Sequence, residues 1–291
     1  MGHGSALRGV DCGQRLMLAH HSNDVVRAWS RASNSDGEFG KMAGHSKWSN
    51  IKRRKGAVDA ARGKLFTKLV KEITTAARLG GSDPDANPRL RVAIVAAKSN
   101  SMPAENITRG IKKGTGELEG VVIDEINYEG YGAGGVAFFV ETQTDNRNRT
   151  SAEVRSAFTK NVGSLGASGS VAWMFKKCGQ FIFDASLYSE EEMMEAALEA
   201  GAQDVRLETG HWVVVSEPAD FTSVLDALDQ AGLKYESAEF TMVAENTVSV
   251  SGKKAQQVMR LLDKLEDLED VMKVHANYEI DDAEMEKIFS E

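Results

Sequence analysis

Five basic residues fall within nine positions of this sequence, and further bases lie on the segment that follows. The first group is Lys47, Lys52, Arg53, Arg54 and Lys55. After it come Arg62 and then three lysines at helical spacing: Lys64, Lys68 and Lys71. Long basic side chains bind phosphate groups in any base sequence, because the contact is mainly electrostatic. We therefore predict that these nine residues form a nucleic-acid-binding surface.

An aromatic residue, Trp48, stands among these bases. An indole can stack on a nucleic-acid base, which would add it to the predicted binding surface. It could equally anchor the amino-terminal arm in a hydrophobic core. Both interpretations stay open at this point.

A second candidate phosphate site lies in the acidic part of the chain, in the sequence DNRNRT from Asp145 to Thr150. This polar loop is expected between a strand and a helix, so Arg147 and Arg149 would lie beside exposed helix N–H groups. Such an arrangement suits phosphate binding. The alternative is a network in which the two arginines bind nearby carboxylates.

Charge is divided unevenly along the chain. Residues 42–119 contain 16 Lys and Arg against 7 Asp and Glu, a net charge of +9. Residues 120–291 contain 14 against 32, a net charge of −18. A basic region joined to an acidic one is expected to turn its basic face toward a polyanion. The alternative is that the basic surface docks on the acidic part of the same molecule.

Other patterns that could carry chemistry are weak. The stretch Gly130–Gly135 matches G-x-G-x-x-G, but β-branched and aromatic residues follow it where the dinucleotide motif needs a helix, so we expect a hairpin turn. Three histidines are isolated from one another and from the two cysteines: His45, His211 and His275. We therefore predict no catalytic residue, no metal site and no cofactor, and a protein that is not an enzyme.

No apolar run reaches the ~18 residues of a membrane helix, and no small-molecule substrate is evident.

The basic region is expected to be helical. Apolar residues recur every three or four positions over 58–78, which predicts a helix that ends at Gly80-Gly81. Pro88 is expected to begin a second helix to Lys98, and a third helix starts near Pro103. Residues 42–119 thus form a predicted basic three-helix domain. Residues 1–41 show neither periodicity nor a secretory signal, and we expect a flexible extension outside the fold.

The acidic part is expected to mix strands and helices. Strands at 123–129 and 136–144 precede a helix that opens with a capping box at Thr150, and a strand is predicted at 170–175. A strand, helix, strand, strand, helix, strand series follows from 180 to 241, with a second capping box at Ser189–Glu192. A helix at 253–268 and a strand at 271–280 come last.

This order predicts a multidomain α+β protein with a helical amino-terminal domain followed by two α/β sandwich-like domains. The first of the two is discontinuous, made of residues 120–176 and 243–291. The second, residues 177–242, has the ferredoxin-like βαββαβ order and is inserted in the first.

Three stretches together resemble one protein family. They are MAGHSKWSNIKRRKGAVDAARGKLFTKL from Met42, SMPAENITRGIKKGTGE from Ser101 and YEGYGAGGVAFFVETQTDNRNRT from Tyr128. They are similar to the YebC/PmpR family, whose mitochondrial relatives include the translational activator of cytochrome c oxidase. The resemblance runs from Met42 to the carboxyl end.

The resemblance implies the same three-domain organisation. It also implies one of two functions, since family members are described in two ways. Bacterial members are described as cytoplasmic, DNA-binding transcriptional regulators. Other members resemble translation factors that bind ribosomal RNA and act on ribosomes, including at stalls on proline-rich sequences. We therefore expect a cytoplasmic nucleic-acid-binding regulator of gene expression, with DNA as the first partner and the ribosome as the alternative.

Overall fold

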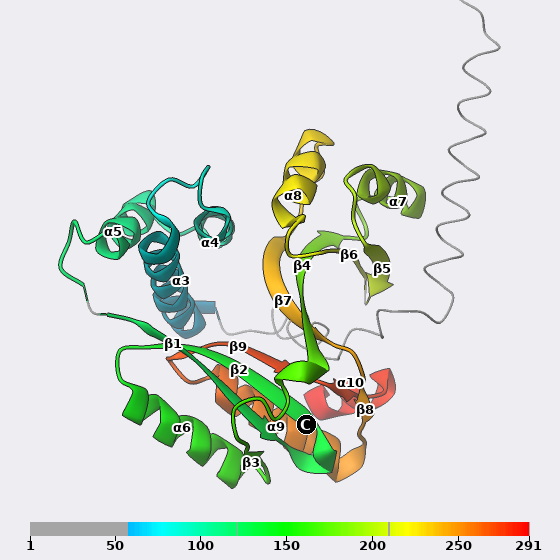
Figure 1. Ribbon diagram of the computed structural model, residues 1–291. Helices are drawn as coiled ribbons and strands as arrows, with labels where there is room; N and C mark the ends of the chain where they lie inside the picture. The colour runs from blue at the N-terminus through cyan, green and yellow to red at the C-terminus, as the bar shows by residue number, and fades with distance from the viewer. Residues whose placement is uncertain (1–57, 121, 209, 291) are drawn as a thin grey trace, which may run out of the picture.

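The computed structural model describes residues 58–120, 122–208 and 210–290 of the chain. Three helices form one group, and two four-stranded sheets with their own helices form the rest (Figure 1). The predicted α+β fold class with a helical amino-terminal region is confirmed, and the strands of both four-stranded sheets pair antiparallel. No helix among the described residues combines the length and apolar character that a membrane span needs.

The helical unit consists of α3 (Val58–Gly80), α4 (Pro88–Ser99) and α5 (Ala104–Gly114), which agree with the three predicted helices. Its core contains Ile73, Leu90 and Ile107, one from each helix. Helices α3 and α5 approach closely at Gly114, where an added Cβ would lie 2.4 Å from the carbonyl oxygen of Thr74. The two helices therefore pack closely at this position, which leaves no room for a side chain larger than that of glycine.

The first sheet has the strand order β3-β1-β2-β9, and all of its pairings are antiparallel. Its strands are β1 (Asp124–Tyr131), β2 (Ala137–Thr144), β3 (Ser164–Leu165) and β9 (Val271–Ala276). The predicted hairpin turn joins β1 to β2 through a short 3-10 turn, η1 (Ala133–Gly135), in which Gly134 and Gly135 have φ of 77° and 82°. These left-handed angles favour glycine, so the glycines serve the turn.

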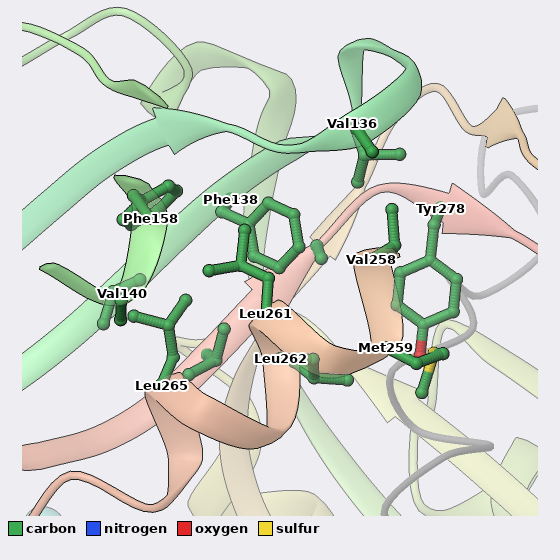
Figure 2. Packing of buried hydrophobic residues seen from close by; sticks show 14 of the residues in the cluster. Val136, Phe138, Val140, Phe158, Val258, Met259, Leu261, Leu262, Leu265 and Tyr278 are labelled. Atoms are coloured by element: carbon green, nitrogen blue, oxygen red, sulfur yellow. The ribbon is translucent and has the colours of Figure 1, made fainter. Parts of the chain in front are cut away.

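Two helices, α6 (Arg147–Lys160) and α9 (Gly252–Glu266), cover one side of the first sheet. Figure 2 shows leucines of α9 directed at Phe138 and Val140 of β2. Phe138 and Phe158 meet edge to face, with ring centroids 5.9 Å apart. Such a core fixes α9 on the sheet, and the carboxyl end of α9 matters for the candidate site below.

The second sheet has the order β5-β6-β4-β7, again with antiparallel pairings. Its chain order is strand, helix, strand, strand, helix, strand, as predicted. The elements are β4 (Phe175–Asp184), α7 (Glu190–Glu199), β5 (Asp204–Glu208), β6 (His211–Ser216), α8 (Phe221–Gln230) and β7 (Ser237–Ala244). Helix α7 begins with the predicted capping box, in which Ser189 and Glu192 bond to each other's backbone N–H groups. All strands of this sheet lie between β2 and β9 in the sequence, while β2 and β9 pair with each other. The predicted domain boundaries stay a prediction.

The remaining elements are short or terminal. Strands β8 (Val248–Ser249) and β10 (Tyr278–Glu279) pair in parallel, and α10 (Asp282–Ser290) follows. The strand predicted at 271–280 is interrupted at Asn277, because its side-chain oxygen accepts the N–H of Ala137 at 2.7 Å.

Two sequence predictions in the acidic part were wrong. Helix α6 begins at Arg147, and Asn146 caps it by accepting the N–H of Arg149 at 3.1 Å. The predicted cap, Thr150, lies inside the first turn, because the Asx cap four residues earlier satisfies the helix start. Where a strand was predicted at 170–175, the chain forms a 3-10 turn, η2 (Ala172–Met174), and β4 begins only at Phe175. Backbone N–H groups of this segment bond to the carboxylate of Glu129 and so are not available to a neighbouring strand.

Candidate nucleic-acid interface

Three lysines on one face of α3 point to the carboxyl end of α9. The Nζ atoms of Lys64 and Lys68 donate to the carbonyl oxygens of Asp267 and Glu266, at 3.4 and 2.9 Å. Lys71 reaches the carbonyl oxygen of Glu269 at 3.5 Å. The last carbonyls of a helix lack partners within the helix and carry its negative dipole end, so cations stabilise them. The predicted lysine row thus joins the helical unit to the acidic part of the molecule.

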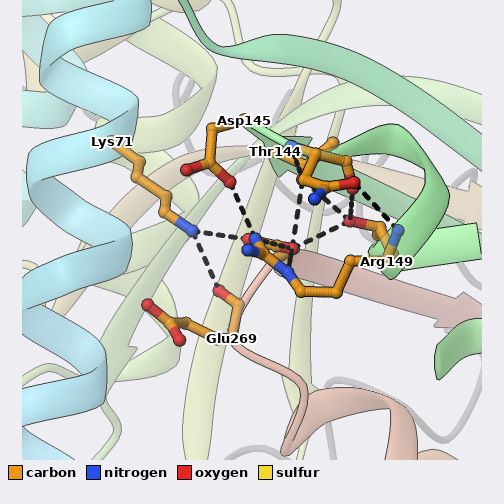
Figure 3. A network of polar contacts seen from close by, with 8 residues as sticks. Lys71, Thr144, Asp145, Arg149 and Glu269 are labelled. Carbon is orange, nitrogen blue, oxygen red and sulfur yellow. Dashed lines mark hydrogen bonds and ion pairs between the residues drawn. The ribbon is translucent and has the colours of Figure 1, made fainter. Parts of the chain in front are cut away.

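Asp270 is the centre of this junction. Its side chain is only 1% exposed, and its Oδ1 lies 2.8 Å from Lys71 Nζ. Its Oδ2 accepts from Arg149 Nη2 at 2.7 Å and from the hydroxyls of Thr150 and Thr144 at 2.8 and 3.1 Å (Figure 3). Burial alone would raise the pKa of Asp270, but the hydrogen bonds from Lys71, Arg149 and Thr150 outweigh it and lower the pKa to about 2. The carboxylate is therefore ionised at neutral pH.

The arginines of the DNRNRT loop are both paired with carboxylates. Arg149 also bonds to Asp145, at 2.8 Å between Nη2 and Oδ1. Arg147 is largely exposed, and its Nε donates to Asp124 Oδ2 at 2.8 Å. This hydrogen bond lowers the pKa of Asp124. The structure thus contains the carboxylate network that the sequence left open as the alternative to phosphate binding.

A second polar junction, which the sequence did not predict, ties the helical unit to the first sheet. Arg89 of α4 bonds to Glu72 of α3 and to Glu125 of β1, with Nε–Oε1 and Nη2–Oε1 distances of 2.7 and 2.6 Å. Gln143 of β2 donates to the same two glutamates. The hydrogen bond from Arg89 is the main cause that lowers the pKa of Glu125. No local pattern reveals this cluster, because its members come from four different elements.

Not every predicted binding residue can be placed. Six lie outside the described residues: Lys47, Trp48, Lys52, Arg53, Arg54 and Lys55. Arg62 belongs to α3, but its side chain is outside the described part. Of the others, the structure brings together Lys71 and Arg149 at Asp270 and lines up Lys64 and Lys68 at the end of α9. Their contact with nucleic acid stays a prediction.

The described histidines are packed against carboxylates. His275 Nε2 lies 2.7 Å from Glu141 Oε1, and His211 Nε2 lies 3.4 Å from Glu236 Oε2. His45 lies outside the described residues. Within the described residues, no three His, Cys, Asp or Glu side chains are grouped so that they could hold a metal ion.

Comparison with known proteins places this arrangement in a family. Residues 46–117 match the model of the TACO1/YebC protein N-terminal domain, and residues 123–278 match that of the TACO1/YebC second and third domain. The chain belongs to the TACO1/YebC family. The match to the first model spans the helical unit, and the match to the second spans both sheets.

Relatives in this family are similar in sequence to this chain over nearly their whole length. A "probable transcriptional regulatory protein" of Trichlorobacter lovleyi is 56% identical over 247 residues, 85% of this chain and all of that protein. A protein of Geobacter sulfurreducens with the same description is 54% identical, with the same coverage. The crystal structure of a conserved hypothetical protein from Aquifex aeolicus, 48% identical, superposes with a TM-score of 0.73 over 78% of this chain and 93% of that one.

Proposed function

We propose that this TACO1/YebC family member is a nucleic-acid-binding regulator of gene expression, and specifically a cytoplasmic DNA-binding transcriptional regulator. The observation that carries the proposal is the division of charge, +9 over residues 42–119 and −18 over residues 120–291. The names of the bacterial relatives agree with it. The basic helical region would bind the phosphate backbone of DNA. Its lysine and arginine side chains would release the counterions that are condensed on DNA, and this release favours binding.

The contacts of α3 suggest which basic residues hold the molecule together and which are left to bind DNA. The helical unit is held on the body by three lysines of α3, which bond to the end of α9 and to Asp270: Lys64, Lys68 and Lys71. Other bases of the unit are exposed: Lys98 at the end of α4, and Lys112 and Lys113 at the end of α5. In the proposal, the exposed bases and the cluster at Lys52–Lys55 contact DNA, and the α3 lysines orient them. The acidic body disfavours binding of a polyanion elsewhere on the molecule.

Removing the cluster Lys52–Lys55 by alanine substitution should flatten the salt dependence of duplex DNA binding. The slope of log K against log salt should fall by ~0.9 for each phosphate that the variant no longer neutralises. The measurement is a titration of duplex DNA with the full chain at several salt concentrations.

A control of equal charge change comes from the acidic body. It replaces four exposed lysines with alanine: Lys160, Lys234, Lys253 and Lys254. We expect this control to keep the wild-type slope. Equal slopes for the wild-type chain and the Lys52–Lys55 variant would contradict the assignment of the basic region as the DNA-binding end.

A further inference from the structure

A pocket of about 480 Å³ lies between the helical unit and the body. Residues of α3 and α5 form one side. The other side includes Asp145 in the turn after β2, Arg149 in the first turn of α6, and Glu269 before β9. The volume falls within the ~300–1,000 Å³ of typical small-molecule sites. A ligand in this pocket would contact the helical unit and the body at once.

Most of the charged residues that line the pocket are basic. Four bases line it, Lys71, Arg109, Lys113 and Arg149, against two acids, Asp145 and Glu269. Lys71 and Arg149 are held by Asp270, so their positions at the wall are fixed (Figure 3). Because these two cations already pair with carboxylates, the other two bases of the lining, Arg109 and Lys113, are left for phosphate oxygens, and arginine can bind them with two parallel hydrogen bonds.

The two bases from α5 are not held in strong ion pairs. Arg109 pairs with Glu105 at 3.0 Å, but both side chains are exposed, and such pairs hold weakly in water. Within the part of the chain that the structure describes, the Lys113 ammonium has no hydrogen-bond or ion-pair partner. A phosphate group entering the pocket would therefore meet one unpaired ammonium and one guanidinium in a weak pair.

Apolar side chains line the same pocket beside these cations. Phe66 and Val70 come from α3, and Ile123 comes from the segment before β1. Asn106 of α5 adds an amide that can donate and accept hydrogen bonds. An inorganic anion needs only the cations, whereas a nucleotide also carries a flat ring that an aromatic and aliphatic wall can cover. The combination favours a nucleotide.

We propose that this pocket binds a nucleotide through its phosphate, with Arg109 and Lys113 on the phosphate and the wall at Phe66 on the base. The inference rests on the proposed function, because it assumes a nucleic-acid partner. The same phosphate chemistry has two sources, a nucleotide of the DNA strand or a free mononucleotide. The former makes the pocket part of the DNA interface, and the latter makes it an effector site between the helical unit and the body.

Three variants of the full chain test the pocket. Lys113→Ala removes the unpaired cation. Thr67→Trp fills the pocket without changing charge, since Thr67 is exposed on α3 and lines the pocket. Lys112→Ala is the matched control: it removes the same charge from the same end of α5, and Lys112 is exposed but does not line the pocket. Thermal unfolding of each variant confirms that it folds before binding is compared.

Two probes distinguish the sources: a duplex DNA followed by fluorescence anisotropy, and thymidine monophosphate followed by calorimetry. We expect Lys113→Ala to weaken binding of one probe by about tenfold, the loss of one charge-assisted hydrogen bond. Thr67→Trp should weaken binding of the same probe by a similar factor, because the indole occupies the space that the ligand needs. Lys112→Ala should weaken it by less than about threefold. A selective loss for DNA assigns the pocket to the strand, and a selective loss for the mononucleotide assigns it to a free effector.

The outcomes separate this inference from the proposed function. If the wild-type chain binds DNA and all three variants change the affinity for both probes to the same extent, the pocket is not a nucleotide site. The proposed function is not affected by that result. A wild-type chain that binds neither probe overturns both.

Discussion

Replacing Asp270 with alanine should lower the free energy of unfolding by about 3–5 kcal/mol, the range for breaking a buried ion pair by removing one partner. The substitution leaves Lys71, whose side chain is 18% exposed, without its carboxylate, and it removes the acceptor shared by Arg149, Thr144 and Thr150. Chemical denaturation followed by circular dichroism measures the loss. Because Lys71 belongs to the helical unit, the junction between that unit and the body should weaken as well.

Asp267→Ala is the matched control for this prediction. Asp267 lies three residues earlier in the same segment, is exposed, and takes part in the junction through its backbone carbonyl rather than its side chain. We expect its removal to change stability by no more than ~0.5 kcal/mol. A loss for Asp270→Ala no larger than that for Asp267→Ala would show that the buried carboxylate does not organise the junction.

The Asp270 network also predicts a dependence of stability on pH. The pKa of Asp270 is lowered from 3.8 to about 2 in the folded chain. A carboxyl group with a lowered folded pKa contributes stability that is present above its unfolded pKa and is lost as the pH falls toward the folded value. The free-energy difference between the wild-type chain and Asp270→Asn should therefore shrink by about 2 kcal/mol between pH 5 and pH 2. A constant difference over this range would contradict the lowered pKa.

Replacing Glu129 with alanine should cost about 3–5 kcal/mol for a different reason. Its carboxylate is buried and accepts the N–H groups of Gly169, Val171 and Ala172 at 2.6, 2.7 and 2.8 Å. Burial alone would raise the pKa of Glu129, but these backbone hydrogen bonds outweigh it and lower the pKa. A hydrogen bond to a charged group contributes ~1.5–3 kcal/mol, and three such bonds are lost together. Of the three donors Val171 is buried, so its N–H is also left without water as a replacement.

Hydrogen exchange resolves this effect at individual residues. In Glu129→Ala, the amides of Gly169, Val171 and Ala172 should lose protection, while those of the β1–β2 pairing keep it. Glu195→Ala, an exposed glutamate of α7, serves as the control and should leave these amides protected. Wild-type protection in Glu129→Ala would contradict the role of the carboxylate in holding the segment before β4.

Patterns that depend on nearby residues were predictable from the sequence. Helix α8 has the predicted bounds, Phe221–Gln230, because its apolar residues follow a clear helical period. The capping box at Ser189–Glu192 was predictable because both partners lie within one turn. At Thr150 the same type of signal failed, because Asn146 competes for the helix start and the threonine hydroxyl bonds to Asp270 instead.

Contacts between distant residues were not predictable in the same way. Lys71, Arg149 and Asp270 meet although 78 and 121 positions separate consecutive members of the group. The sequence identified the two bases and placed them at a phosphate, but nothing near Asp270 marks it among the many acids of its segment. Glu129 was missed for the same reason, because its three partners lie some 40 residues further along and are backbone groups. A charge pattern gives the number of cations in a region but does not give their partners.

The most direct test of the central claim is a competition between two polyanions. Labelled full chain is offered a library of duplex DNA together with ribosomes at physiological salt, and its distribution between them is measured. If the chain is a DNA-binding regulator, a subset of the DNA sequences should retain it against ribosomes, because specific contacts add to the electrostatic binding that all sequences share. Retention on ribosomes, with every DNA sequence displaced alike, would contradict the account.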